Sequence, residues 1–211
     1  MSALFTQICY GEIMKKLFTY LFLFILSFSI PSHANDIKEF EIEGISIGDS
    51  LLEHLSKEQI ISEIEVNKPT YNYLNEDFGE VYLFESSDKY YALSFMVKPK
   101  DKYFNIYSVT GLIDYDNKIE QCFTKKKEIV KEFSLIFNNA TQREDTLEFD
   151  WDPTGKSISY NTYFDFENGD YAGVSCAKFK KSLKIENNWV DGLSVKIGKK
   201  EILEWFDNPI N

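Results

Sequence analysis

The stretch that decides the fold is residues 158–179, ISYNTYFDFENGDYAGVSCAKF. Apolar, aromatic and β-branched side chains occupy every second position of its first nine residues, namely Ile158, Tyr160, Thr162, Phe164 and Phe166. This period of two predicts a half-buried strand. Glu167–Asp170 contains Asn-Gly, which predicts a type I′ turn because both residues tolerate positive φ. Tyr171–Phe179 then supplies a returning strand, so the segment predicts an antiparallel hairpin.

A second block of predicted strands precedes this hairpin in the chain. Its members, rich in β-branched and aromatic residues, are Phe78–Phe84, Tyr90–Val97 and Tyr103–Ile113, with turn signals at 86–89 and 98–101. Within the middle strand one face carries Tyr91, Leu93, Phe95 and Val97. Alternation of this kind is typical of a half-buried antiparallel sheet.

Between the two blocks lies the clearest helix, predicted over residues 119–137. Its apolar residues recur at spacings of three and four: Ile119, Cys122, Phe123, Ile129, Val130, Phe133, Ile136 and Phe137. An earlier helix is predicted to begin after Ser56, because Ser56 and Gln59 form a capping box. We expect Ile60, Ile61 and Ile64 on its buried side and its end at Pro69.

The remaining elements are shorter. We expect strands at Ile37–Glu43, around Leu147–Trp151 and at Leu193–Ile197, a short helix from Asp49 to His54, and a terminal helix at Lys199–Phe206. Strands and helices therefore segregate into blocks, which predicts an α+β fold. We expect an antiparallel sheet with the helix of about residues 119–137 packed on one face and short helices near both ends. Residues 35–211 would form a single domain, with halves 35–116 and 117–211 as a possible degenerate repeat.

The first 34 residues predict where the protein is located. Lys15 and Lys16 precede an apolar run from Leu17 to Ile30, and small residues lead to Ala34. This pattern, over residues 14–34, is typical of a secretory signal peptide. The run is shorter than the roughly 20 residues that a spanning helix needs. We therefore expect cleavage after Ala34, a periplasmic or secreted product, and no membrane anchor after cleavage.

Residues 1–13 do not resemble the start of a signal. They are interpreted as a non-native extension with translation beginning at Met14, or as a longer, atypical n-region.

Charge and residue inventory narrow the possible functions. The chain has 23 basic and 34 acidic residues, and removal of Glu12, Lys15 and Lys16 with the signal leaves 21 and 33, a net charge near −12. Nucleic acids and anionic membranes attract basic surfaces, so neither is an expected partner. After cleavage the only histidine is His54, too few for a zinc site. No cofactor or metal site is predicted, although an all-carboxylate site for a hard cation stays open.

The two cysteines left after cleavage are Cys122 and Cys176. In an exported chain such a pair favours a disulfide. Cys122 falls on the apolar stripe of the predicted helix, and Cys176 shares a strand face with Val174. The alternative is two buried thiols.

Three segments carry a resemblance to a known family. FEIEGISIGDSLLEHLSKEQI (40–60), CFTKKKEIVKEFS (122–134) and GLSVKIGKKEILEWF (192–206) resemble small exported proteins of Pelagibacter-type marine alphaproteobacteria. This resemblance implies a Gram-negative envelope and no particular activity. More weakly, GISIGDSLLEHLS resembles the start of small envelope domains of the outer-membrane assembly lipoprotein and β-lactamase-inhibitor-protein type, with Asp49 in place of the usual Met or Thr and without the lipoprotein cysteine.

Two functional interpretations follow. The first is a non-catalytic binding or interaction module for a protein, peptide or small molecule of the envelope. Four tyrosines expected to face outward are candidate binding aromatics: Tyr90, Tyr103, Tyr107 and Tyr163. The second is an envelope hydrolase that uses paired carboxylates. A deep pocket with two buried acids would favour the hydrolase, whereas an apolar groove or an exposed aromatic row would favour the binding module.

Overall fold

The computed structural model describes residues 37–84, 87–149, 152–187 and 189–210. The predicted signal segment lies outside the described residues, and residues 34–211 form one compact unit. Its strands are β1 (Gly79–Phe84), β2 (Ala92–Val97), β3 (Ile106–Asp114), β4 (Thr141–Glu148), β5 (Ile158–Asp165), β6 (Tyr171–Lys178) and β7 (Gly192–Gly198). Its helices are α2 (Lys57–Asn67), α3 (Ile119–Ile136), α4 (Lys181–Asn187) and α5 (Lys200–Phe206), with 3₁₀ turns at Ile37–Glu39, Leu51–Glu53 and Lys68–Tyr71.

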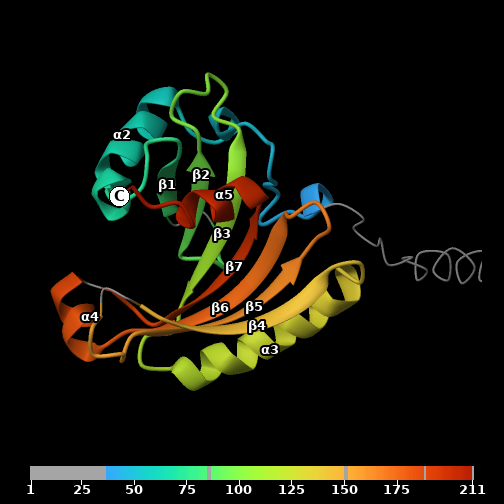
Figure 1. The fold of residues 1–211 in the computed structure, drawn as a ribbon, viewed down its shortest axis with the longest axis vertical. Coiled ribbons are helices and arrows are strands. Elements are labelled where there is room, and N and C mark those ends of the chain that lie inside the picture. The colour runs from blue at the N-terminus through green and yellow to red at the C-terminus, as the bar shows by residue number, and fades with distance from the viewer. Residues whose placement is uncertain (1–36, 85–86, 150–151, 188, 211) are drawn as a thin grey trace, which may run out of the picture. The chain divides into compact units, whose positions relative to one another are not determined.

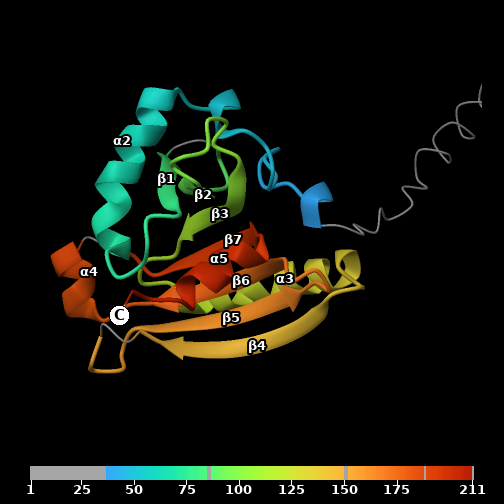
Figure 2. The ribbon, with the colours of Figure 1, turned by 45° about the horizontal axis from the view of Figure 1, so that its top comes forward.

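All seven described strands belong to one sheet (Figures 1 and 2). Their order is β1-β2-β3-β7-β6-β5-β4, and every neighbouring pair is antiparallel. The strand nearest the C-terminus, β7, therefore lies in the middle and joins the first block of strands to the second. The predicted α+β class and the antiparallel sheet are confirmed.

The hairpin of β5 and β6 forms where the alternation predicts it. The two strands pair from Ile158 opposite Lys178 to Asp165 opposite Tyr171. The turn, however, is not type I′, because Gly169 has a φ of 88° and Asn168 keeps a negative φ. The Phe166 amide donates to the Asp170 carbonyl at 3.0 Å. The loop is therefore one residue longer than a two-residue type I′ turn, and only Gly169 has a positive φ.

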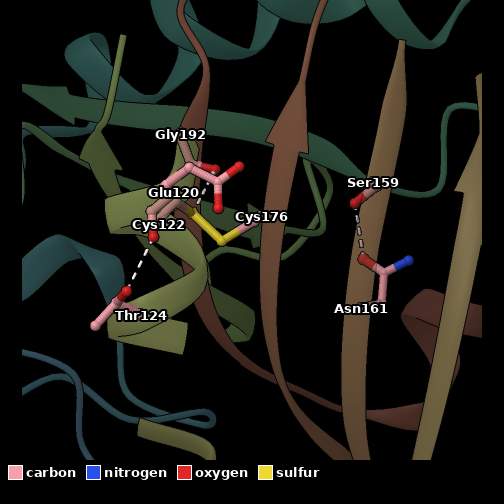
Figure 3. The surroundings of a disulfide bond; sticks show 7 residues. All are labelled: Glu120, Cys122, Thr124, Ser159, Asn161, Cys176 and Gly192. Atoms are coloured by element: carbon pink, nitrogen blue, oxygen red, sulfur yellow. Dashed lines mark hydrogen bonds between the residues drawn. A yellow bond between two sulfur atoms is a disulfide. The ribbon is translucent and has the colours of Figure 1, made fainter. Parts of the chain in front are cut away.

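A disulfide joins α3 to β6 (Figure 3). Cys122 and Cys176 are both fully buried, and their α-carbons are 6.1 Å apart. The predicted pairing is therefore confirmed. Further along α3, Phe133 packs edge-on against Phe164 of β5 with ring centroids 5.8 Å apart. These two contacts link α3 to β6 and to β5.

Side chains on the two faces of the sheet form two separate apolar clusters. The main core includes Phe95 of β2 and the buried residues of α2 and α3. The smaller cluster, on the opposite face, consists of Leu74, Phe78, Met96, Ile202 and Trp205. Because Phe95 and Met96 are neighbours in β2, this strand is buried on both faces. The expectation of a half-buried strand is wrong here, since α5 and the 71–78 segment cover its second face.

Two strand predictions need correction. Ile37–Glu43 is not a strand, because Glu43 and Gly44 both have positive φ and fold the chain back so that Ile42 and Ile45 pair with each other. The strand expected around Leu147–Trp151 is β4, which begins earlier, at Thr141, ends at Glu148 and is exposed along its whole length. Asp150 and Trp151 lie outside the described residues.

The helix predictions are mostly accurate. α2 begins with the predicted capping box, and it buries Ile60 and Ile64 but leaves Ile61 exposed. The short helix α4 was not predicted.

Candidate functional site

A groove of 540 Å³ lies beside β1. Its walls come from segments far apart in the chain: the end of α2, the 68–76 segment, β1, α5 and the C-terminal tail. The tail is attached to the groove wall by the Ile210 amide, which donates to the Tyr73 carbonyl at 2.8 Å. Five of the lining residues are largely apolar and decide its character: Ile64, Leu74, Phe78, Trp205 and Ile210.

One buried carboxylate, Glu80 of β1, lines this groove. Its residue is 8% exposed, and both of its oxygens accept hydrogen bonds from neutral hydroxyls. The Tyr71 hydroxyl donates to Oε2 at 2.7 Å, and the Ser94 hydroxyl donates to Oε1. Within the described residues no lysine or arginine forms an ion pair with Glu80. The hydrogen-bond partners of the Glu80 side chain are therefore neutral hydroxyls, and it has no ion-pair partner among the described residues.

The surrounding phenols respond to this environment. Burial raises the pKa of Tyr71 far above its ordinary value, and the negative charge of Glu80 raises it further. The pKa of Tyr82 is raised for the same two reasons, with burial again the larger. Both phenols therefore stay protonated at any physiological pH, and the Tyr71 hydroxyl remains a donor to the carboxylate.

Aromatic rings also line the groove. Trp205 of α5 lies with its ring centroid 5.5 Å from both Tyr71 and Phe78. Its indole N–H donates to the side-chain oxygen of Asn75 at 2.8 Å, so the polar edge of the ring is already bonded. Its contribution to the groove lining is therefore apolar surface. At the rim, the exposed pair Lys68 and Glu76 lies 2.7 Å apart.

The four candidate tyrosines are not brought together. Tyr90 is partly buried against the main core and its ring covers Gly111, so the expectation that it faces outward is wrong. Tyr107 is packed in the smaller cluster, with its ring 5.1 Å from Phe78.

The other two tyrosines also lie apart from each other. Tyr163 lies on β5, where the Arg143 guanidinium is 4.7 Å from its ring and Lys196 is 5.6 Å away. Tyr103 is 55% exposed in the turn before β3, with Lys102 4.5 Å from its ring. These four residues do not form one aromatic row.

Other chemistries find less support in the described residues. No group of three or more His, Cys, Asp or Glu side chains there is arranged to hold a metal ion. No described helix combines the length and apolar character needed to cross a bilayer. Within the groove lining, Glu80 is the only buried carboxylate, since Glu65 and Glu76 are exposed. The arrangement of two buried acids that a hydrolase would need is not present in this groove.

The comparisons add no relative. No protein-family model, curated protein or solved structure matches this chain.

The groove residues were not identified from the sequence, although the sequence around one of them is unusual for a strand. Glu80 interrupts the otherwise apolar and aromatic strand that begins at Phe78, and an acid inside such a strand is unusual unless it is hydrogen-bonded or functional. Trp205 carried no comparable signal, because its apolar helix face predicts only core packing.

Proposed function

We propose that this chain is an exported, non-catalytic binding protein, and that its groove beside β1 holds a ligand with a cationic amine attached to apolar carbon. The single observation that carries this proposal is Glu80, a buried carboxylate with hydroxyl partners and no ion-pair partner among the described residues. The ligand would be a small molecule or the basic end of a peptide in the periplasm or the external medium. We also propose that the chain is cleaved after Ala34 on export. We propose further that it is one of the small exported proteins of Pelagibacter-type bacteria that it resembles.

The energetic argument begins with the cost of the carboxylate. Removing an ionised group from water costs several kcal/mol unless charge or hydrogen bonds compensate it. Tyr71 and Ser94 supply two hydrogen bonds and leave the net charge in place. An ammonium group in the groove would add a charge-assisted hydrogen bond, which is worth about 1.5–3 kcal/mol. A cation is thus the kind of partner that would compensate this carboxylate best.

The walls support the same class of ligand. Cations with apolar substituents are held by aromatic faces, at about 0.5–2 kcal/mol per contact. Tyr71, Phe78 and Trp205 line the same groove as Glu80, and Phe78 already makes a contact of this kind, with the Lys98 ammonium 5.2 Å from its ring centroid. The aliphatic lining would bury the apolar part of the ligand. We further propose that α3 serves the fold rather than the site, as the cover of the opposite face near β6, to which it is tied by the disulfide.

Three probes that differ only in the charge of one end test this proposal. 2-Phenylethylamine, 2-phenylethanol and 3-phenylpropionate share a phenyl ring and carry a positive, neutral and negative terminus. We expect the amine to bind most tightly by calorimetry, and Glu80→Gln to weaken the amine by about tenfold to a hundredfold. Glu80→Gln should leave the alcohol almost unchanged.

The matched control is Glu65→Gln, which removes an exposed carboxylate from the same groove. We expect little change in amine binding, because an exposed charge is screened by water. Thermal unfolding of each variant shows whether the fold is intact. Equal binding of the three probes, or amine binding by a folded Glu80→Gln variant at wild-type strength, would refute the proposal.

A further inference from the structure

A second hollow lies at the far end of β5 and β6, bounded by α4 and the 155–158 segment. Its volume is 1020 Å³. Five lysines line it, namely Lys156, Lys178, Lys180, Lys181 and Lys184. The chain as a whole has a net charge of −11, so this concentration of positive charge runs against the overall balance. The hollow shares no lining residue with the groove beside β1.

Four of these lysines lack acidic partners within the described part of the chain. Lys184 is the exception, because its ammonium forms ion pairs with Asp116 and with Asp191, the latter at 3.1 Å. Among the residues that the structure describes, the other four form no ion pair. The paired lysine thus links α4 to Asp116 and Asp191 through partly buried ion pairs, while the four other lysines leave the hollow positively charged.

The backbone that carries these lysines is fixed by hydrogen bonds. Asp152 accepts from the amide of Ser157 at 3.0 Å and from its hydroxyl at 2.7 Å. The Ser157 hydroxyl oxygen in turn accepts from the Lys180 amide at 3.0 Å. On the other side, the Phe179 amide donates to Asp191 at 2.8 Å. Because both walls are held this way, the lysines are presented from a preorganised frame.

The hollow also has an apolar wall. Trp189 is 39% exposed and lies with its ring centroid 5.3 Å from Phe179. Ile185 of α4 is 76% exposed, and Tyr160 of β5 completes this side. Exposed large apolar residues beside unpaired lysines offer contact to a ligand that is both charged and partly apolar.

We propose that this hollow binds a compact anion that carries two or more phosphate or carboxylate groups on a ring or apolar body. Lysine is a common ligand for phosphate and pairs with carboxylates, and four of them match several negative groups. The ligand is compact because the rest of the protein is acidic. An extended polyanion such as a nucleic acid, or an anionic bilayer, would meet repulsion beyond the hollow.

The experiment titrates pyrophosphate, citrate and phthalate into the exported protein, with binding followed by calorimetry. The test variant is Lys180→Gln combined with Lys181→Gln. The control is Lys127→Gln with Lys131→Gln, which removes the same charge from exposed positions of α3. We expect the test variant to weaken binding by about tenfold or more, since each charge-assisted contact is worth about that factor, and the control to leave it within about twofold.

A third variant separates the two walls. Trp189→Leu should weaken phthalate, which has a ring, by more than it weakens pyrophosphate, which has none. Circular dichroism confirms that each variant is folded. The proposal is overturned if the control pair weakens binding as much as the test pair, if none of the three anions binds at millimolar concentration, or if single-stranded DNA or phosphatidylglycerol vesicles bind more tightly than the compact anions.

Discussion

Removing the bond between Cys122 and Cys176 should destabilise the fold substantially. The bond closes a loop of 54 residues. In the chain-entropy model, a cross-link over a loop of that length lowers the entropy of the unfolded chain by about 14 cal/mol/K. At 25 °C this corresponds to about 4 kcal/mol of stability. For a domain of this size, each 1 kcal/mol shifts the melting temperature by about 2–4 °C, so the expected loss is about 8–16 °C.

The measurement compares oxidised protein with protein unfolded and refolded in reductant, and with a Cys122→Ala, Cys176→Ala variant. Urea unfolding gives the free energy of each form. The variant also loses two buried sulfur atoms, so it should be the least stable of the three. Both sulfurs are fully buried, and the native bond should therefore resist reductant until the protein unfolds.

The control for surface effects is Thr124→Ala, a change on the exposed face of α3 near the same end of the helix. It should alter the unfolding free energy by less than about 0.5 kcal/mol. The reasoning is refuted if oxidised and reduced proteins unfold within about 1 kcal/mol of each other, because a cross-link over this loop would then contribute almost nothing.

Two smaller predictions concern local hydrogen bonds. Ser56→Ala should lower the free energy of unfolding in urea by about 1 kcal/mol, because the side chains of Ser56 and Gln59 accept hydrogen bonds from each other's amides at the start of α2. Ser62→Ala, an exposed change within the same helix, should leave the free energy of unfolding unchanged. Equal effects of the two changes would contradict the capping argument. Hydrogen bonds from Thr154 and Ser157 hold the pKa of Asp152 well below its ordinary value. A lowered native pKa gives stability that is present above the unfolded value near 3.8 and lost as pH falls through the native pKa, so Asp152→Asn should flatten the loss of stability below about pH 4. If the Asp152→Asn variant loses stability below about pH 4 as steeply as the wild type does, this carboxylate is not the cause of that loss.

The parts of the fold that sequence predicts are those with local causes. The capping box at Ser56 and the hairpin around Gly169 depend on residues within a few positions of each other. β4 was harder because it is an edge strand, polar on both faces, and TQREDTLE therefore has no apolar alternation. α4 has seven residues, too few for a helical period to emerge.

The groove depends on contacts between distant segments. Trp205 bonds Asn75 across a separation of 130 residues, and no local pattern reports that contact. The lysine-lined hollow is similar, since its lysines become neighbours only when the 156 turn meets the end of β6. Lysine is also common along the whole chain, so composition did not single these residues out.

The central position of β7 has a consequence for the order in which the chain can fold. Until Gly192–Gly198 emerges from the ribosome, β3 and β6 each lack the neighbour that lies between them, and no ladder hydrogen bonds join the described strands of the two blocks. A chain stopped before Gly192 can complete neither the sheet nor the core that spans it. Folding of the complete sheet is thus delayed until β7 has been synthesised. The strand that is synthesised after the other six described strands, β7, is thus the strand that completes the sheet.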